Sequence, residues 1–250
     1  MTTPQSQIAA QLHTTKALPV SPTWLNSFVS STTALQRNVP ISALTQTALF
    51  RILASDIRDS LHTNNPSALL PADIVDPSVQ ERRLPGPVPV QVLDIEDIGT
   101  SLWSQVEAIE RVERGEAIRG REIVRAVNVG GGGGGGEEDE EAEGGGNPGP
   151  AASENESHGP HRLIVQDAAG TRAVAVELKR VQGISVAKLA IGAKLVIRNA
   201  TVARGMILLA PDCMTLLGGK IESMDHAWKE GRKARLLARI TEMPGGDQSG

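Results

Sequence analysis

The chain has 250 residues, of which 40% are apolar, and it carries a formal net charge of −4. This length and apolar content suit one or two globular domains, each with a real core. The single cysteine, Cys213, excludes a disulfide within the chain and a cysteine-based metal site. No stretch approaches the ~18 consecutive apolar residues of a membrane span, so we expect no membrane partner.

The charge is unevenly distributed along the chain. Residues 130–160 contain eight acidic residues and no lysine or arginine. Residues 161–250 contain 14 lysines and arginines against 8 acidic residues, a net charge of +6. This half is basic enough to meet an acidic partner or nucleic acid, although the excess is mild.

Helical patterns dominate the N-terminal quarter. Residues 1–20 are polar and are expected to form a disordered tail. A helix is predicted from Ser21, a suitable N-cap, and Pro22, which fits the first helical position. A second helix and a third short one follow, so residues 21–62 predict a small helical module with its own aromatic residues. Residues 63–87 contain five prolines and are expected to be a link.

A β-strand is predicted directly after the link. Val88, Val90 and Val92 alternate with other residues, and the pattern shifts near Leu93, which indicates a bulge. Residues 100–127 have helical spacing first and an arginine-rich, irregular character afterwards. Residues 128–159, with seven consecutive glycines and an acidic run, have the composition of a disordered linker.

Short strands resume at residue 161 and continue almost to the end. They comprise a hairpin, a short turn of helix near 184–190, and further strands up to about 218; a closing helix is predicted over 223–240 and a tail over 241–250. A five-stranded barrel with a helix between its third and fourth strands is an OB-type fold. The strand count requires the strand at 88–98, so the barrel spans 88–222 and residues 100–160 form an insertion loop between its first two strands.

No constellation of catalytic residues appears in the sequence. The glycine run lacks the lysine and hydroxyl residue of a phosphate-binding loop, and His158 and His161 lack a third metal ligand. We therefore expect no enzyme activity, no metal and no cofactor. An OB barrel can bind single-stranded nucleic acid, but residues 88–98 and 161–221 contain no phenylalanine, tyrosine or tryptophan on which bases could stack. A protein-binding barrel is the preferred interpretation, and an OB-fold nucleic-acid-binding protein is the alternative.

Four segments, in their order along the chain, carry a resemblance to a known family. They are "VPVQVLDIEDIGTS" at the first strand, "GEAIRGREIVR" in the insertion, "LAIGAKLVIRN" at a later strand and "ARGMILLAPDCMTLLGGKIESM" near the end. Together with the helical module, these segments resemble the N-terminal part of the RecQ-mediated genome instability protein 1 family, in its fungal form, over roughly residues 18–240.

This resemblance implies a non-catalytic, nuclear cofactor of a type IA topoisomerase III that works with a RecQ-family helicase. Such a complex dissolves double Holliday junctions, and the loop between the first two barrel strands modulates the topoisomerase gate in favour of decatenation. Direct contact with DNA is expected to be weak at most. Larger members carry a second, C-terminal OB domain, so the chain is expected to be either a short form or a fragment.

The resemblance also selects candidate contact residues. On the barrel, we expect Lys194 and Arg198 to form part of the topoisomerase-docking face. In the insertion, tryptophan and arginine are favoured at interface hot spots. The predicted insertion contacts are Trp103, Val106, Ile109, Val112, Ile118, Arg119, Arg121 and Arg125.

Overall fold

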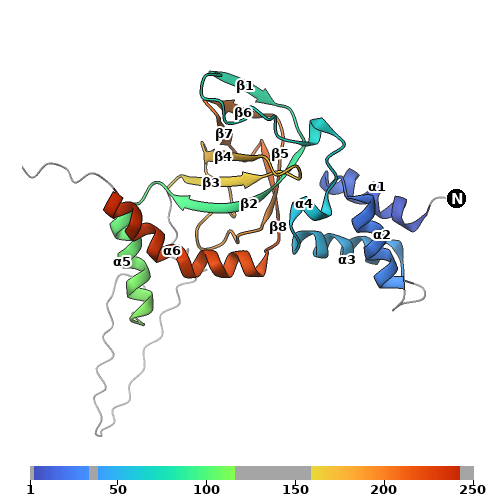
Figure 1. Ribbon diagram of the computed structural model, residues 1–250, viewed down its shortest axis with the longest axis horizontal. Coiled ribbons are helices and arrows are strands. Elements are labelled where there is room, and N and C mark those ends of the chain that lie inside the picture. The colour runs from blue at the N-terminus through green and yellow to red at the C-terminus, as the bar shows by residue number, and fades with distance from the viewer. Residues whose placement is uncertain (1–2, 34–38, 116–158, 243–250) are drawn as a thin grey trace, which may run out of the picture.

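The computed structural model describes residues 3–33, 39–115 and 159–242 (Figure 1). A group of N-terminal helices is followed by a curled β-sheet and a long C-terminal helix. The N-terminal helices lie at one end of the sheet, and a helix from the insertion lies with the C-terminal end of the last helix at the other (Figure 1). The predicted order of helices, OB-type sheet and closing helix is confirmed.

The N-terminal group contains four helices. They are α1 (Pro4–Lys16), α2 (Pro22–Thr33), α3 (Ile41–Leu53) and α4 (Ile57–Ser60). On α2, Trp24 and Phe28 stack with their ring centroids 5.6 Å apart, and the Arg51 guanidinium lies over the Phe28 ring. The buried faces of these helices form a core distinct from the main core of the sheet, and Ala168 and Leu217 of the sheet domain contribute to it. This part therefore has a hydrophobic core of its own, as the aromatic residues of the sequence indicate.

Helix α1 corrects the prediction of a disordered tail over residues 1–20. Thr3 caps it by accepting a hydrogen bond from the Ser6 amide, and Ile8 and Leu12 are almost completely buried in the helical core. The two side chains stand four residues apart and therefore share one face of the helix. The surrounding sequence is so polar that two apolar residues alone did not reveal the helix.

The proline-rich link is also more ordered than predicted. It contains a short 3₁₀ helix, η1 (Pro66–Ala68), and strand β1 (Glu81–Leu84), which pairs with a later strand. Leu70, Ile74 and Leu84 belong to the core of the sheet. The link is therefore an integral part of the sheet domain rather than a spacer between two domains.

The sheet has eight strands, with the order β1-β6-β7-β4-β3-β2-β5-β8. The strands after β1 are β2 (Val88–Asp97), β3 (His161–Gln166), β4 (Arg172–Glu177), β5 (Lys194–Ile197), β6 (Ala200–Ala203), β7 (Met206–Leu209) and β8 (Met214–Gly218). All neighbours are antiparallel except β4 and β7, which are parallel. Only Arg198 and Asn199 separate β5 from β6, although these strands are far apart in the order, so the sheet curls round on itself.

Several predicted details of the strands are confirmed and others are wrong. The predicted bulge near Leu93 is present, because the β2–β3 register shifts between Val92 and Asp94. The predicted hairpin after residue 160 is the β3–β4 pair. The turn of helix predicted near 184–190 is instead a series of turns, and β1 and β6 were not foreseen.

Two helices flank the sheet. The insertion between β2 and β3 starts with α5 (Leu102–Glu113), and the chain continues after β8 with α6 (Glu222–Glu242). The short helix predicted at the start of the arginine-rich region is therefore confirmed, and so is the closing helix. The 128–159 linker and the 241–250 tail fall, apart from Gly159 and residues 241–242, outside the described residues.

Candidate protein-interaction site

The insertion begins and ends at neighbouring positions on β2 and β3, which we call its base. Asp97 at the end of β2 pairs with His161 at the start of β3, and the Ile98 amide donates a 3.0 Å hydrogen bond to the Pro160 carbonyl oxygen. Gly99 and Gly159 touch so closely that a Cβ atom on Gly99 would lie 2.6 Å from the Cα of Gly159. The two ends of the insertion are therefore held together like the ends of a hairpin.

Helix α5 begins directly at this base and is fixed to it. Asp97 accepts hydrogen bonds from the Gly99 and Thr100 amides through Oδ1, at 2.8 and 3.1 Å. Ser101 caps the helix by accepting a hydrogen bond from the Ser104 amide. The buried Gln105 side chain donates 3.0 Å hydrogen bonds back to the carbonyl oxygens of Asp97 and Thr100. The start of the insertion is thus a continuation of the folded domain.

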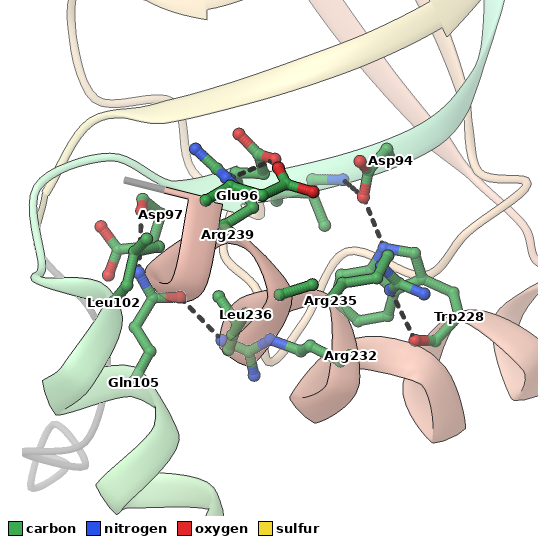
Figure 2. Close-up of a pocket in the computed structure, with 13 residues that line it drawn as sticks. Asp94, Glu96, Asp97, Leu102, Gln105, Trp228, Arg232, Arg235, Leu236 and Arg239 are labelled. Atoms are coloured by element: carbon green, nitrogen blue, oxygen red, sulfur yellow. Dashed lines mark hydrogen bonds and ion pairs between the residues drawn. The ribbon is translucent and has the colours of Figure 1, made fainter. Parts of the chain in front are cut away.

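Polar contacts join α5 to α6. Lys233 on α6 pairs with Glu113 at 2.6 Å and with Glu110 at 3.3 Å, both on α5. The Arg232 guanidinium donates to Gln105 Oε1 at 3.2 Å (Figure 2). Burial lowers the pKa of Arg232, an effect opposed by the negative charge of Asp97. We call this pair of helices, with the contacts just described, the α5–α6 clamp.

Helix α6 is in turn fixed to the outside of β2. The Trp228 indole donates a 2.5 Å hydrogen bond to Asp94 Oδ1, and Arg239 pairs with Glu96 at 2.7 Å (Figure 2). The guanidinium groups of Arg232 and Arg235 lie 5.8 and 5.6 Å from the centroid of the Trp228 ring. These groups border a hollow of about 250 Å³ between β2, α5 and α6. Because the polar groups that line this hollow bind one another, the hollow is part of the packing between β2, α5 and α6.

The predicted contact residues of α5 divide into two sets. Trp103 is 60% exposed and Val112 is 75% exposed, as a partner contact requires. Val106, in contrast, is buried, so its prediction as a contact is wrong. Ile109 is half-buried and faces α6 beside Trp228 and Val186. The remaining predicted contacts, Ile118, Arg119, Arg121 and Arg125, lie outside the described residues.

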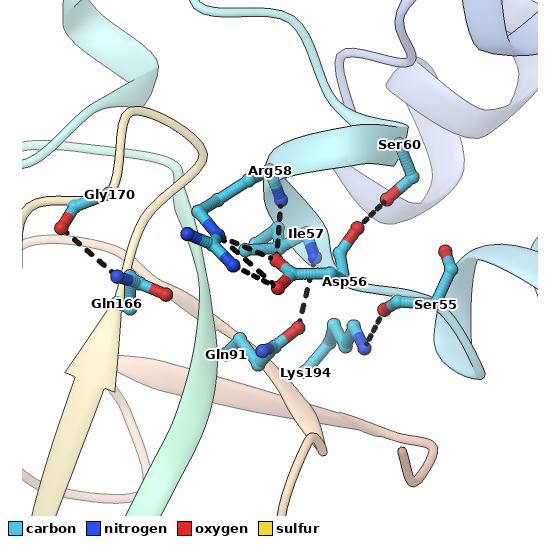
Figure 3. Close-up of polar contacts among 9 residues, drawn as sticks. All are labelled: Ser55, Asp56, Ile57, Arg58, Ser60, Gln91, Gln166, Gly170 and Lys194. Carbon is cyan, nitrogen blue, oxygen red and sulfur yellow. Dashed lines mark hydrogen bonds and ion pairs between the residues drawn. The ribbon is translucent and has the colours of Figure 1, made fainter. Parts of the chain in front are cut away.

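Lys194 occupies a different environment from the one predicted. Its side chain is fully buried, and its ammonium group donates to three carbonyl oxygens, those of Ser55 at 2.6 Å, Gly192 at 2.7 Å and Leu53 at 3.2 Å. The oxygens of Leu53, the last residue of α3, and of Ser55 just after it belong to the helical module, so Lys194 joins this module to the sheet (Figure 3). Burial lowers its pKa to about 8, and the nearby Asp56 opposes that effect.

The burial of Lys194 overturns its prediction as a docking residue, because no partner can reach its side chain. Arg198, the other residue predicted on the docking face, is exposed. The junction around Lys194 has further contacts that the sequence did not reveal. The Gln91 side chain accepts a 2.9 Å hydrogen bond from the Ile57 amide, and the hydrogen-bonded Arg58 lowers the pKa of Asp56 (Figure 3).

A second buried polar pair lies at the base of the insertion. His161 Nδ1 is 2.6 Å from Glu177 Oε2, and both side chains are only 3% exposed. Glu177 also accepts hydrogen bonds from the backbone amides of His161 and Val181. No pattern in the sequence indicates this pair, since a histidine after a Gly-rich, acidic segment resembles any solvated histidine.

Other kinds of site find no support in the part of the chain that the structure describes. Within residues 3–33, 39–115 and 159–242, no group of three or more His, Cys, Asp or Glu residues is arranged to hold a metal ion. No helix in these ranges is long and apolar enough to cross a membrane. Cys213 is buried, and its sulfur contacts backbone groups of the β7–β8 turn.

Two family models match successive parts of the chain. The model described as "RMI1, N-terminal helical domain" matches residues 12–60, and the one described as "RMI1, N-terminal OB-fold domain" matches residues 70–232. The second match alone covers more than half of the chain, and its domain type agrees with the curled sheet. The chain belongs to the RMI1 family.

A relative in this family comes from Schizosaccharomyces pombe and is named RecQ-mediated genome instability protein 1. The two sequences are 26% identical over 202 residues, which cover 81% of this chain and 82% of the relative. The likeness is therefore one of nearly whole chains. Membership in the RMI1 family supports a role for the chain as a genome-stability scaffold.

Proposed function

We propose that this chain is a non-catalytic scaffold that binds a type IA topoisomerase III and acts with a RecQ-family helicase. In this complex it promotes decatenation and the dissolution of double Holliday junctions, and the insertion between β2 and β3 modulates the topoisomerase gate. A role on chromosomal DNA implies a nuclear location. The family membership supports the genome-stability part of this proposal.

The exposure of Trp103 is the observation that supports the topoisomerase contact. This side chain is 60% exposed on α5, a helix that the α5–α6 clamp fixes to the sheet at the base of the insertion. An exposed tryptophan on a rigid element loses little conformational freedom when it is buried by a partner, and tryptophan is a frequent hot-spot residue. The insertion would thus start from a fixed anchor and extend from it into the partner.

The direct test uses the full chain and its own species' topoisomerase III. We expect Trp103→Ala to weaken binding measured by calorimetry by at least about tenfold, the scale of one interface hot spot. Phe50→Ala is a matched control, because Phe50 is an aromatic residue that is 64% exposed on α3, far from the insertion in the sequence. Absence of micromolar binding by the wild type, or equal effects of the two substitutions, would overturn the proposed contact.

The gate role needs a separate test, since binding and modulation are distinct. The narrow base allows Gly99 and Gly159 to be joined by a short hairpin turn in place of residues 100–158. We expect this variant to retain the fold of the sheet but to lose stimulation of decatenation. Deletion of residues 130–158 alone should have a much smaller effect, because this stretch offers no apolar or basic anchors. Unchanged stimulation without residues 100–158 would exclude a gate role for the insertion.

A further inference from the structure

The outer face of the sheet carries a continuous group of aliphatic side chains over β3, β4 and β7. The register places Ile164 opposite Val174, Val174 beside Met206, and Val176 beside Leu208. Leu178 follows Val176 two residues later, and its amide continues the pairing by donating to the Leu209 carbonyl oxygen. We call this group the aliphatic face; its members are Ile164, Val174, Val176, Leu178, Met206 and Leu208.

These side chains point away from the core. The residues between them, such as Ala175 and Ile207, are fully buried, and alternate residues of a strand face opposite sides. Met206 is 40% exposed and Leu178 is 66% exposed, so the aliphatic face is open to solvent. The solvated side of such a sheet is ordinarily polar. A contiguous apolar patch in that position marks a binding surface.

Basic residues border the aliphatic face. Arg162 pairs in register with Val176, Arg172 precedes Val174 by two residues on the same side of β4, and Arg204 precedes Met206 in the turn before β7. Lys179 and Arg180 directly follow Leu178, and all of these basic residues are at least partly exposed. Within the described residues, no hydrogen bond or ion pair occupies the side chains of Arg172 and Lys179.

The described acidic residues nearby leave Arg172 and Lys179 of this border without an ion pair. Glu177 on β4 points inward and is buried against His161, and Glu96 is shared between Arg162 and Arg239. An aliphatic centre with a basic border is complementary to a segment with aliphatic and acidic side chains.

Bases of single-stranded nucleic acid would need aromatic partners for stacking. Neither β2 nor residues 159–221 contain phenylalanine, tyrosine or tryptophan. The chemistry of the aliphatic face therefore favours protein over nucleic acid, even though basic residues surround it.

We propose that the aliphatic face binds a segment of a partner protein in which aliphatic residues alternate with aspartate or glutamate. The alternation of such a segment matches the rows of side chains on the sheet, with its apolar side on Val174 and Met206 and its carboxylates toward Arg172 and Lys179. The centre of this surface, Val174 and Met206, is distinct from Trp103, because β3 separates β4 and β7 from β2, and α5 follows β2. The proposal does not depend on topoisomerase binding.

The test uses a fluorescein-labelled peptide of about ten residues, the length of a long strand, with Val or Ile alternating with Glu. We expect the full chain to bind it in the micromolar range by fluorescence anisotropy, and more weakly as salt rises. Met206→Asp should weaken binding at least about tenfold, or about 1.4 kcal/mol. Leu237→Asp on α6 is the matched control, since Leu237 is 38% exposed against 40% for Met206, and it should leave binding unchanged.

Further variants test the charge and protect against a folding defect. Arg172→Ala should weaken binding and reduce its dependence on salt, and a peptide with Lys in place of Glu should bind less well. If Met206→Asp fails to fold, Leu178→Asp replaces it, because Leu178 lies beyond the end of β4 and is 66% exposed.

Four results would overturn the proposal. They are no binding up to about 1 mM peptide, equal binding by Met206→Asp or its Leu178→Asp substitute, displacement of the peptide by a single-stranded oligonucleotide, and self-association of the wild type that Met206→Asp abolishes. The last two would assign the aliphatic face to nucleic acid and to a second copy of the chain, respectively.

Discussion

The ammonium group of Lys194 donates a 2.6 Å hydrogen bond to the carbonyl oxygen of Ser55, 139 residues earlier in the chain. Together with the bonds to Leu53 and Gly192, this contact joins the end of α3 to the start of β5. The buried charge has no adjacent carboxylate in these contacts and depends on backbone carbonyl dipoles. Lys194 therefore helps to determine the position of the helical module relative to the sheet.

We expect Lys194→Met to lower the free energy of unfolding by about 1–3 kcal/mol, because three carbonyl oxygens lose the ammonium donor, although that of Leu53 keeps the Lys220 amide, while the cost of burying a charge is relieved. Denaturation in urea measures this change. Lys179→Met, at an exposed lysine of the same domain, should change stability by less than about 0.5 kcal/mol. Equal stability of the two variants would show that the junction does not need the ammonium group.

The lowered pKa of Lys194 also predicts a dependence of stability on pH. Below pH 8 the lysine is protonated in both the folded and the unfolded chain, and the cost of burying the charge is fully present. Between about 8 and the ordinary value of 10.5, the folded chain has released this proton and the unfolded chain has not, so stability rises with pH. The full rise corresponds to about 3 kcal/mol.

The measurement compares the free energy of unfolding of wild type and Lys194→Met at several pH values from 7 to 10. The difference between them isolates the contribution of Lys194, because the other ionisable groups are common to both. We expect the wild type to gain stability relative to the variant above pH 8. A difference that stays constant over this range would show that the pKa of Lys194 is not lowered.

Lys194 and β2 show how far the sequence determines the structure. The alternation of Val88, Val90 and Val92 and its shift near Leu93 predicted a strand with a bulge, because side-chain period and burial are local properties. The burial of Lys194 depends on carbonyl groups more than a hundred residues away. A lysine that enters a strand after a glycine turn looks like a solvated residue in the sequence, and only the packing of α3 against the sheet distinguishes it.

The same limit applies to the candidate contact residues. Helical spacing predicted α5, but spacing alone did not separate Val106, which is buried, from Val112, which is 75% exposed. That distinction follows from where α6 lies, and the position of α6 follows from single contacts such as Trp228 with Asp94. A fold class can therefore be read from patterns, whereas the exposed part of a site requires the tertiary contacts.

Glu177 gives a second prediction about stability, at the base of the insertion. Its carboxylate accepts hydrogen bonds from the backbone amides of His161 and Val181, which Glu177→Ala would leave buried without this acceptor. We expect this substitution to lower the free energy of unfolding by about 2–5 kcal/mol in chemical denaturation. Glu177→Gln keeps one acceptor oxygen and should cost less.

The control for this prediction is Glu222→Ala at the start of α6, where the side chain is 79% exposed. Its effect on unfolding should be within about 0.5 kcal/mol. If Glu177→Ala were equally mild, another group or water would have to satisfy the two amides, and the base of the insertion would not depend on the carboxylate.

The α5–α6 clamp leads to a prediction about local opening. Lys233 is the common partner of Glu110 and Glu113, so Lys233→Glu places three negative charges where one cation balanced two carboxylates. We expect amide hydrogen exchange over residues 102–113 to become faster while exchange in β3 and β4 stays the same, because α5 loosens without unfolding the sheet.

Adding Glu113→Lys to Lys233→Glu should restore part of the protection by re-forming the pair with reversed charges. Lys179→Glu, at an exposed lysine just after β4, should leave this exchange unchanged. Unaltered exchange in the Lys233→Glu variant would mean that Gln105 and Val106 hold α5 without the ion pairs, and the proposed rigid anchor for Trp103 would then rest on the buried contacts alone.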